Sequence, residues 1–336
     1  MRSPLSTSFR MTRIVPWILL AWLLLPVSSP APLIYTPGEG WTYQPVGQEG
    51  KWTRTRADEQ LKVAKDAFEE KRYGLALKAA RRTVNVWPFS DYAPEAQYLV
   101  GRCQEAKGKD EAAFKAYQKV IERYPKLDNY DDIVRSQFEI ANRFLAGQWF
   151  RLWNVIPVYP SMDKTITLYE QIIKNGPYSD IAPKAQMNIA QAHKDKLNSD
   201  LEMAAKAYEK AADRYSDKSI GVDALYSLAE TYQQMAGNAE YDQSLAARAI
   251  ATYTDFVTLH PTDPRVSKAR EMVRVLKTEQ ARGSFDIARF YEKNKKWRAA
   301  AIYYNDVVDK DPTSQYAQQA REKIDAINKR QDKDES

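Results

Sequence analysis

The sequence has 336 residues, of which 44% are hydrophobic and 28% are charged, and its formal net charge is +6. This length allows one elongated repeat array or two globular domains. Half of the net positive charge comes from arginines in the first 30 residues, so there is no support for a segregated basic face that would bind nucleic acid.

Residues 1–30 are typical of an export signal. Arginines precede an uncharged run from Ile14 to Val27, and no acidic residue occurs in this segment. These 14 residues are fewer than the about 20 that a spanning helix needs. Cleavage of the signal is favoured. An uncleaved anchor stays open, because Pro30 and Pro32 follow the candidate cleavage sites and the uncharged run continues to Ile34.

Residues 31–56 follow the signal and differ from it in composition. Prolines and glycines alternate there with aromatic residues, among them Trp41 and Trp52. Such a composition predicts an extended tether between the signal and the rest of the chain.

A repeat begins after the tether. Four tyrosines are each followed by a proline eight residues later, and a small residue lies four positions before each tyrosine. A second small residue lies further upstream in each copy, so each unit is predicted to be a helical hairpin. The repeat tyrosines and their prolines are Tyr117 and Pro125, Tyr169 and Pro177, Tyr253 and Pro261, Tyr304 and Pro312, with Tyr208 as a copy that lacks only the proline.

The spacing of the small residues resembles the tetratricopeptide repeat. Twelve positions separate Gly101 from Ala113 and Ala288 from Ala300, as is usual in that repeat. The third, fourth and fifth units have longer spacings, which predict longer turns or extended helices. We therefore predict an all-α fold, a tetratricopeptide-like superhelical array of five to six helical hairpins over residues 57–328, with a charged tail at 329–336.

The third unit carries an apolar interruption at residues 147–160. Its aromatic residues are Trp149, Phe150, Trp153 and Tyr159. Folding of this segment into the gap left by the stretched turn is favoured. The alternative is a hydrophobic contact with a partner, a client polypeptide or the membrane surface.

The sequence gives little support for catalysis. His193 and His260 lie in different units and show no paired ligand spacing, and there is no phosphate-binding glycine loop or nucleophile elbow. We expect His193 to be packed between helices and Cys103 to be buried in a helix. We therefore predict a binding scaffold that is not an enzyme and has no metal or cofactor.

The segment from Ala288 to Ala300 is similar to the last full repeat of the BamD-like family. It has an aromatic pair, Phe290 and Tyr291, then a short polar turn, a tryptophan and alanines. The resemblance covers most of residues 57–328. Family members are usually lipoproteins anchored through a cysteine at the signal cleavage site, and residues 1–56 contain no cysteine. Lipidation is therefore not expected.

The resemblance implies a periplasmic scaffold of the outer-membrane β-barrel assembly machinery, associated with the outer membrane. The implied partners are the barrel-forming subunit and unfolded outer-membrane proteins. The turn that would dock the barrel-forming subunit comprises Lys293, Asn294, Lys295, Lys296 and Trp297. The residues that would line a client-binding groove, by position in the first repeats, are Tyr73, Tyr92, Tyr98 and Arg102.

Two other classes of function stay open. One is a periplasmic repeat protein, similar to the YbgF-like proteins, that coordinates cell-envelope or cell-wall machinery. Such proteins often place a coiled coil before their repeats, and no heptad run occurs here between the signal and the array. The other is an enzyme with a helical-array domain, which would show a cleft with perturbed acidic side chains.

Overall fold

The computed structural model describes residues 33–36, 40–43, 52–125, 129–152, 156–238 and 243–335. The predicted export signal, residues 1–30, lies outside these ranges. None of the helices within them is long and apolar enough to cross a membrane. The chain divides into two compact units, Met1–Ala96 and Gln97–Ser336.

The first unit contains a β-hairpin and a helical hairpin. Strand β1 (Leu33–Thr36) pairs antiparallel with β2 (Gly40–Tyr43), and helix α2 (Ala57–Glu69) packs on α3 (Tyr73–Val86). Part of the segment predicted as an extended tether is therefore paired in a β-hairpin, in which β-branched and aromatic residues favour the strands. Gln60 fixes the start of the helical hairpin, because its side chain donates to the carbonyl of Trp52 and accepts from the amide of Arg54.

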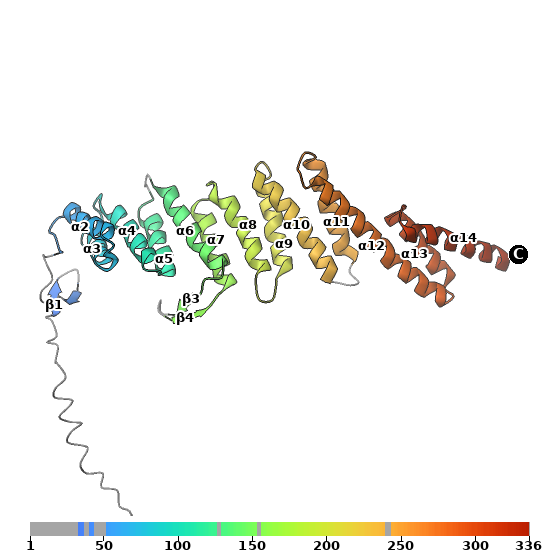
Figure 1. The fold of residues 1–336 in the computed structure, drawn as a ribbon, viewed down its shortest axis with the longest axis horizontal. Coiled ribbons are helices and arrows are strands. Elements are labelled where there is room, and N and C mark those ends of the chain that lie inside the picture. The colour runs from blue at the N-terminus through green and yellow to red at the C-terminus, as the bar shows by residue number, and fades with distance from the viewer. Residues whose placement is uncertain are drawn as a thin grey trace, which may run out of the picture. The chain divides into compact units, whose positions relative to one another are not determined.

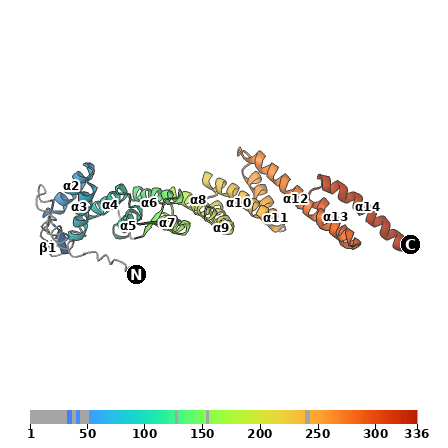
Figure 2. The same ribbon diagram turned by 60° about the horizontal axis from the view of Figure 1, so that its bottom comes forward.

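The second unit is a series of helices, each packed on the next (Figure 1). The same order of neighbours is seen in the turned view (Figure 2). Its elements are α4 (Ala93–Ala106, which begins in the first unit), α5 (Asp110–Arg123), α6 (Tyr130–Leu145), β3 (Phe150–Leu152), β4 (Ile156–Tyr159), α7 (Met162–Asn175), α8 (Ile181–Lys194), α9 (Leu201–Arg214), α10 (Ser219–Asn238), α11 (Gln243–Leu259), α12 (Val266–Lys293), α13 (Trp297–Lys310) and α14 (Gln315–Glu335). The all-α hairpin array is confirmed, and the two short β-hairpins are additions to it.

The repeat tyrosines lie in the core, as the repeat pattern predicts. Each is at most 3% exposed, so that its hydroxyl needs a partner inside the protein. In every case the hydroxyl meets a polar side chain on the first helix of the same hairpin. The pairs are Tyr117 and Glu105 at 2.8 Å, Tyr169 and Asn142 at 2.7 Å, Tyr208 and Gln191 at 3.5 Å, Tyr253 and Gln233 at 2.8 Å, and Tyr304 and Glu292 at 2.6 Å.

The longer spacings of three units have the predicted causes. Strands β3 and β4 separate α6 from α7 in the third unit, and a longer turn separates α8 from α9 in the fourth. In the fifth unit α10 has 20 residues and α11 has 17, whereas the helices of the other hairpins mostly have 14.

Helix α12 belongs to two hydrophobic clusters of the second unit. Ala269 and Leu276, in its first half, belong to the main core that starts in α5. Ala281 and Phe285, in its second half, belong to a cluster with α13 and α14. The middle of the helix makes polar contacts instead. Ser284 Oγ donates to Asp306 at 2.6 Å and Thr278 Oγ1 to Asp311 at 2.7 Å. Gln280 Nε2 donates to the Gln243 carbonyl at 3.0 Å.

Candidate protein-docking site

The predicted docking turn joins α12 to α13 within the second unit. Helix α12 ends at Lys293 and α13 begins at Trp297. The amides of Lys295 and Lys296 donate to the carbonyls of Glu292 and Tyr291, at 2.9 and 3.0 Å. The Asn294 side chain donates to the Phe290 carbonyl at 2.8 Å. These bonds satisfy carbonyls at the end of α12 and leave the three lysine side chains directed to solvent.

Lys295 has an uncommon backbone conformation. Its φ is 56°, in the left-handed region, where the Cβ of a lysine is disfavoured, and Lys71 after α2 shares this conformation with a φ of 59°. The equivalent position in the α4–α5 turn is Gly108, with a φ of 65°, and the glycine after α6 is Gly147, with a φ of 94°. A lysine therefore stands at a position that glycine fills in two other hairpins. Such strain is often stored at functional sites.

The docking turn is flanked by aromatic side chains. Phe290 is 62% exposed, and Tyr291 stacks on Tyr303 with ring centroids 5.4 Å apart. Trp297 is half-buried under the guanidinium of Arg330, which lies 4.4 Å from its ring centroid. The surface therefore combines exposed positive charges with fixed aromatic rings, a combination enriched in protein interfaces.

Glu292 is close to the three lysines in sequence, but other groups hold it. Its carboxylate accepts from Lys323 at 2.8 Å and from Tyr304 at 2.6 Å. Burial by itself raises the pKa of Glu292, and the bonds from Lys323 and Tyr304 outweigh burial, so that the pKa lies below its usual value. Glu292 is therefore held by groups outside the docking turn, and within the turn Lys296 Nζ lies 6.0 Å from the ring centroid of Tyr291.

Replacing Lys295 by glycine is expected to stabilise the second unit by about 0.5–1 kcal/mol, because glycine adopts the left-handed conformation without a Cβ clash. Chemical denaturation followed by circular dichroism measures this. The matched control is Lys293→Gly, which places glycine at the last helical position of α12 and should destabilise by about 1 kcal/mol. If Lys295→Gly destabilised the protein, the interpretation that the backbone at Lys295 is strained would be wrong.

The predicted client-groove residues are distributed over both units. In the first unit, Tyr73 is half-buried against Phe68, with ring centroids 5.3 Å apart, and Tyr92 is exposed. In the second unit, Tyr98 is half-buried against Tyr117 at 5.6 Å, and Arg102 is exposed. Tyr73 and Tyr98 thus contribute to packing, and the assignment of the four residues to a client groove stays a prediction.

The apolar interruption is partly folded into the core. Phe150 is buried and stacks on Phe144 with ring centroids 4.0 Å apart and an angle of 10° between the rings. Trp149, in contrast, is 52% exposed. Tyr159 ends strand β4, and Trp153 lies outside the described residues. The favoured packing interpretation accounts for Phe150 and leaves Trp149 without a structural role.

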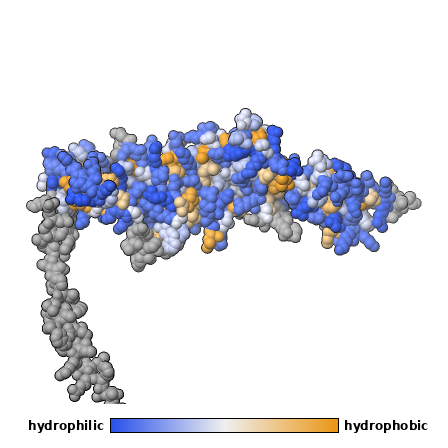
Figure 3. Space-filling model, viewed as in Figure 1, coloured by the Kyte–Doolittle hydropathy of each residue, from blue (hydrophilic) through white to orange (hydrophobic). Residues whose placement is uncertain are grey.

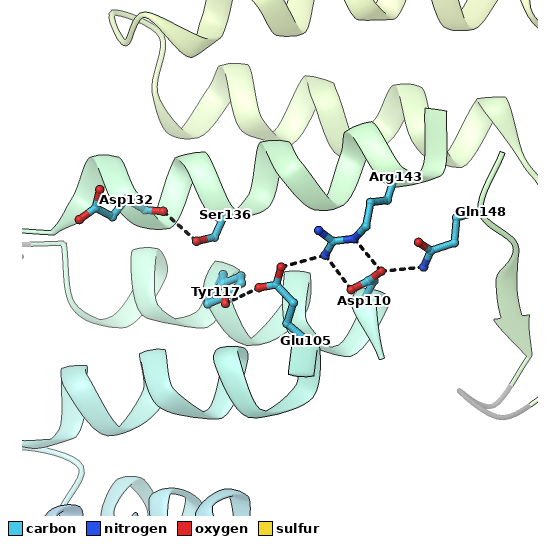
Figure 4. A network of polar contacts seen from close by, with 7 residues as sticks. All are labelled: Glu105, Asp110, Tyr117, Asp132, Ser136, Arg143 and Gln148. Carbon is cyan, nitrogen blue, oxygen red and sulfur yellow. Dashed lines mark hydrogen bonds and ion pairs between the residues drawn. The ribbon is translucent and has the colours of Figure 1, made fainter. Parts of the chain in front are cut away.

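A partly buried polar network fixes the base of this interruption (Figure 4). The Arg143 guanidinium from α6 donates to both oxygens of Asp110, at 2.8 and 3.0 Å, and to Glu105 at 2.9 Å. Gln148, which precedes β3, donates to Asp110 at 2.6 Å, and Tyr117 donates to Glu105 at 2.8 Å. Asp110 is 6% exposed. The network therefore joins α4, α5, α6 and the chain that leads into β3.

The side chains considered for chemistry are packed in the helices. Cys103 and His193 are buried, as predicted. Burial lowers the pKa of His193, and the nearby charge of Lys196 acts in the same direction. Within the described ranges, no group of three histidines, cysteines or acidic residues is placed to hold a metal ion.

The match to known families decides the classification. A family model described as outer membrane lipoprotein, YfiO, matches residues 160–335, which is more than half of the chain. The chain belongs to the YfiO family. Because YfiO is the BamD-like family, the resemblance found in the sequence is confirmed. The match includes α12, the docking turn and α13. A tetratricopeptide-repeat model matches residues 95–126.

Membership in the YfiO family has a general functional consequence. The YfiO and tetratricopeptide-repeat families have non-enzymatic scaffold folds. Membership in them implies protein–protein interactions. The YfiO family is associated with the outer membrane. No curated protein matches the chain.

Solved structures of repeat proteins resemble the YfiO chain only distantly. The C-terminal part of a repeat-containing protein from Cytophaga hutchinsonii is 17% identical, with a TM-score of 0.36, over 80% of this chain and 88% of that one. A tetratricopeptide-repeat protein from Thermus thermophilus is 15% identical, with a TM-score of 0.28, over 65% and 99%. MamA from Desulfovibrio magneticus is 12% identical, with a TM-score of 0.33, over 63% and 98%. These values are too low to indicate a shared function.

Proposed function

We propose that this protein is a periplasmic scaffold of the outer-membrane β-barrel assembly machinery. Its C-terminal hairpin, α12 and α13, docks the barrel-forming subunit, and its N-terminal repeats bind unfolded outer-membrane proteins. The signal in residues 1–30 directs export, and the protein is held at the outer membrane without a lipid on a cysteine. The YfiO match over residues 160–335 carries this proposal.

The docking turn supports the choice of the C-terminal hairpin. Lys293, Lys295 and Lys296 are exposed, and Glu292 is neutralised by Lys323. Exposed charges at an interface rim accelerate association and select a partner of opposite charge. The turn is therefore suited to an acidic surface on the barrel-forming subunit, with Phe290 beside it as an apolar contact.

Affinity purification of the tagged protein from envelope membranes, with mass spectrometry of the retained proteins, tests the proposal. We expect recovery of the barrel-forming subunit. Recovery of cell-wall synthases without that subunit would support the YbgF-like alternative and remove the proposed function.

Reversing the charge of the docking turn, with Lys293, Lys295 and Lys296 all replaced by glutamate, is expected to weaken binding of the barrel-forming subunit by about tenfold or more. The reason is that three attractive charges become repulsive. Binding is measured by surface plasmon resonance over a range of salt concentrations, and the wild-type affinity should fall as salt rises.

The matched control for this variant is charge reversal at Lys115, Lys119 and Lys184, three exposed lysines on α5 and α8. It changes the net charge by the same amount and should leave binding unaltered. Equal losses in both variants would mean that only net charge matters, and an unaltered affinity of the docking-turn variant would exclude this turn as the contact.

A further inference from the structure

Two exposed apolar side chains mark one edge of the second unit. Trp149, before β3, is 52% exposed, and Leu197, in the α8–α9 turn, is fully exposed. Figure 1 shows β3, β4 and the α8–α9 turn along the same lower edge. We call Trp149, Leu197, β3 and β4 the turn edge. Figure 3 shows a hydrophobic spot where the α8–α9 turn lies, on a mostly hydrophilic surface.

Both parts of the turn edge are held against the first turn of α7. The residue beside Leu197, Lys196, pairs with Asp163 at 2.7 Å. The residue beside Trp149, Phe150, has the Lys164 ammonium 5.0 Å from its ring centroid. Since Asp163 and Lys164 are adjacent, the two protruding side chains flank one helix terminus. They therefore lie on the same edge of the second unit.

We propose that the turn edge lies against a phospholipid membrane surface. Tryptophan prefers the interface between lipid headgroups and acyl chains, and apolar side chains beside lysines are typical of interfacial contacts. The strands of the turn edge are also apolar in sequence, Phe-Arg-Leu and Ile-Pro-Val-Tyr. Trp149 and Leu197 protrude from turns, and neither lines a concave pocket of the kind that holds a small molecule. Protruding side chains fit a fluid lipid surface.

The membrane association of the family supports this occupant. YfiO proteins are outer-membrane lipoproteins, and a lipoprotein carries its lipid on a cysteine. Cys103, the one cysteine of the printed sequence, is completely buried within α4. It lies within the repeat array and not at the predicted signal cleavage site, where members of the family usually carry their lipid. The turn edge supplies a contact with the bilayer that does not depend on such a modification, nor on the proposed protein partners.

A site-specific fluorophore tests the contact on the full chain. Cysteine is introduced in three separate variants, Trp149→Cys, Leu197→Cys and Tyr178→Cys, and labelled with the environment-sensitive dye NBD. Buried Cys103 stays unlabelled. Tyr178 is almost fully exposed and follows the opposite end of α7, so it is the matched control. Vesicles contain phosphatidylethanolamine and phosphatidylglycerol, with or without nitroxide groups on the acyl chains.

The expected result is a blue shift of NBD at positions 149 and 197 on vesicle addition, with loss of fluorescence on nitroxide vesicles, and neither effect at position 178. This readout is local, so attachment through another part of the chain does not produce it. Three results would overturn the proposal: no vesicle response at 149 and 197, an equal response at 178, or a response of 149 and 197 to an unfolded outer-membrane protein alone. The last would assign the turn edge to a polypeptide. Binding of the barrel-forming subunit is measured in a separate experiment. A failure of the proposed function can therefore be distinguished from a failure of the membrane contact.

Discussion

Replacing Arg143 by methionine is expected to destabilise the second unit by about 2–3 kcal/mol. The variant leaves Asp110, which is almost completely buried, without its bidentate partner and removes a bond to Glu105. Breaking a fully buried ion pair costs about 3–5 kcal/mol, and we expect less because the Arg143 side chain is 38% exposed. Methionine keeps the aliphatic part of the arginine packing, so the loss is mainly electrostatic.

Hydrogen exchange followed by mass spectrometry measures the effect where it occurs, because repeat arrays open locally. Protection should fall in α4, α5 and α6 and change little in α12 and α13. The matched control is Arg135→Met, since Arg135 is an exposed arginine on the same helix α6. That change should stay within about 0.5 kcal/mol. Equal protection in the two variants would show that the network contributes no net stability.

Replacing Gly221 by alanine is expected to cost about 3 kcal/mol or more. Gly221 lies in the first turn of α10, and a Cβ there would come within 2.1 Å of the Tyr215 carbonyl oxygen at the end of α9. The obstacle is main chain, so the α9–α10 joint has to shift, which exceeds the usual cost of overpacking by a side chain of about 1–3 kcal/mol. Thermal and urea unfolding measure the loss.

The same substitution in the same helix provides a control of opposite sign. Gly237 lies near the end of α10, and a Cβ there would meet nothing within 4 Å. Gly237→Ala should therefore be neutral or stabilise by up to about 1 kcal/mol, because alanine has the higher helix propensity. If both variants behave alike, the close approach at Gly221 is not a determinant of the joint.

The hairpin array could be predicted from the sequence because its spacing is set by packing. The small residues and the repeat tyrosines recur at fixed positions, and these residues are buried. The hydroxyl partners of the tyrosines were missed. They lie either one residue after the small residue of the first helix, as Asn142 and Gln191 do, or four after it, as Glu105, Gln233 and Glu292 do. Both positions are on one helix face. The side chains there are Asn, Gln or Glu, so no single residue type recurs that would have revealed them in the sequence.

The parts of the candidate site that were not predictable depend on contacts between distant residues. The position of the docking turn follows from the end of one helical pattern and the start of the next. The left-handed backbone of Lys295 could not be predicted, because lysine is not a residue type that favours this conformation. The apolar interruption was visible in composition. That Phe150 would turn inward and Trp149 outward depends on the stacking partner Phe144, which no local pattern reveals. The β-hairpins escaped notice because each strand has only three or four residues.

Helix α12 has a mechanical consequence. It is one continuous helix of 28 residues, about 42 Å long, and the docking turn is at its end. A torque that a partner applies to the docking turn therefore reaches the main core along a stiff lever arm. Rotation of α12 and α13 against α11 has to bend this helix or break the bond from Gln280 to the Gln243 carbonyl. The bonds of Thr278 and Ser284 hold α13 to α12, so the two helices turn together. A movement of the docking turn is in this way transmitted to the α10–α11 hairpin, because the continuous helix α12 joins the two without a flexible linker.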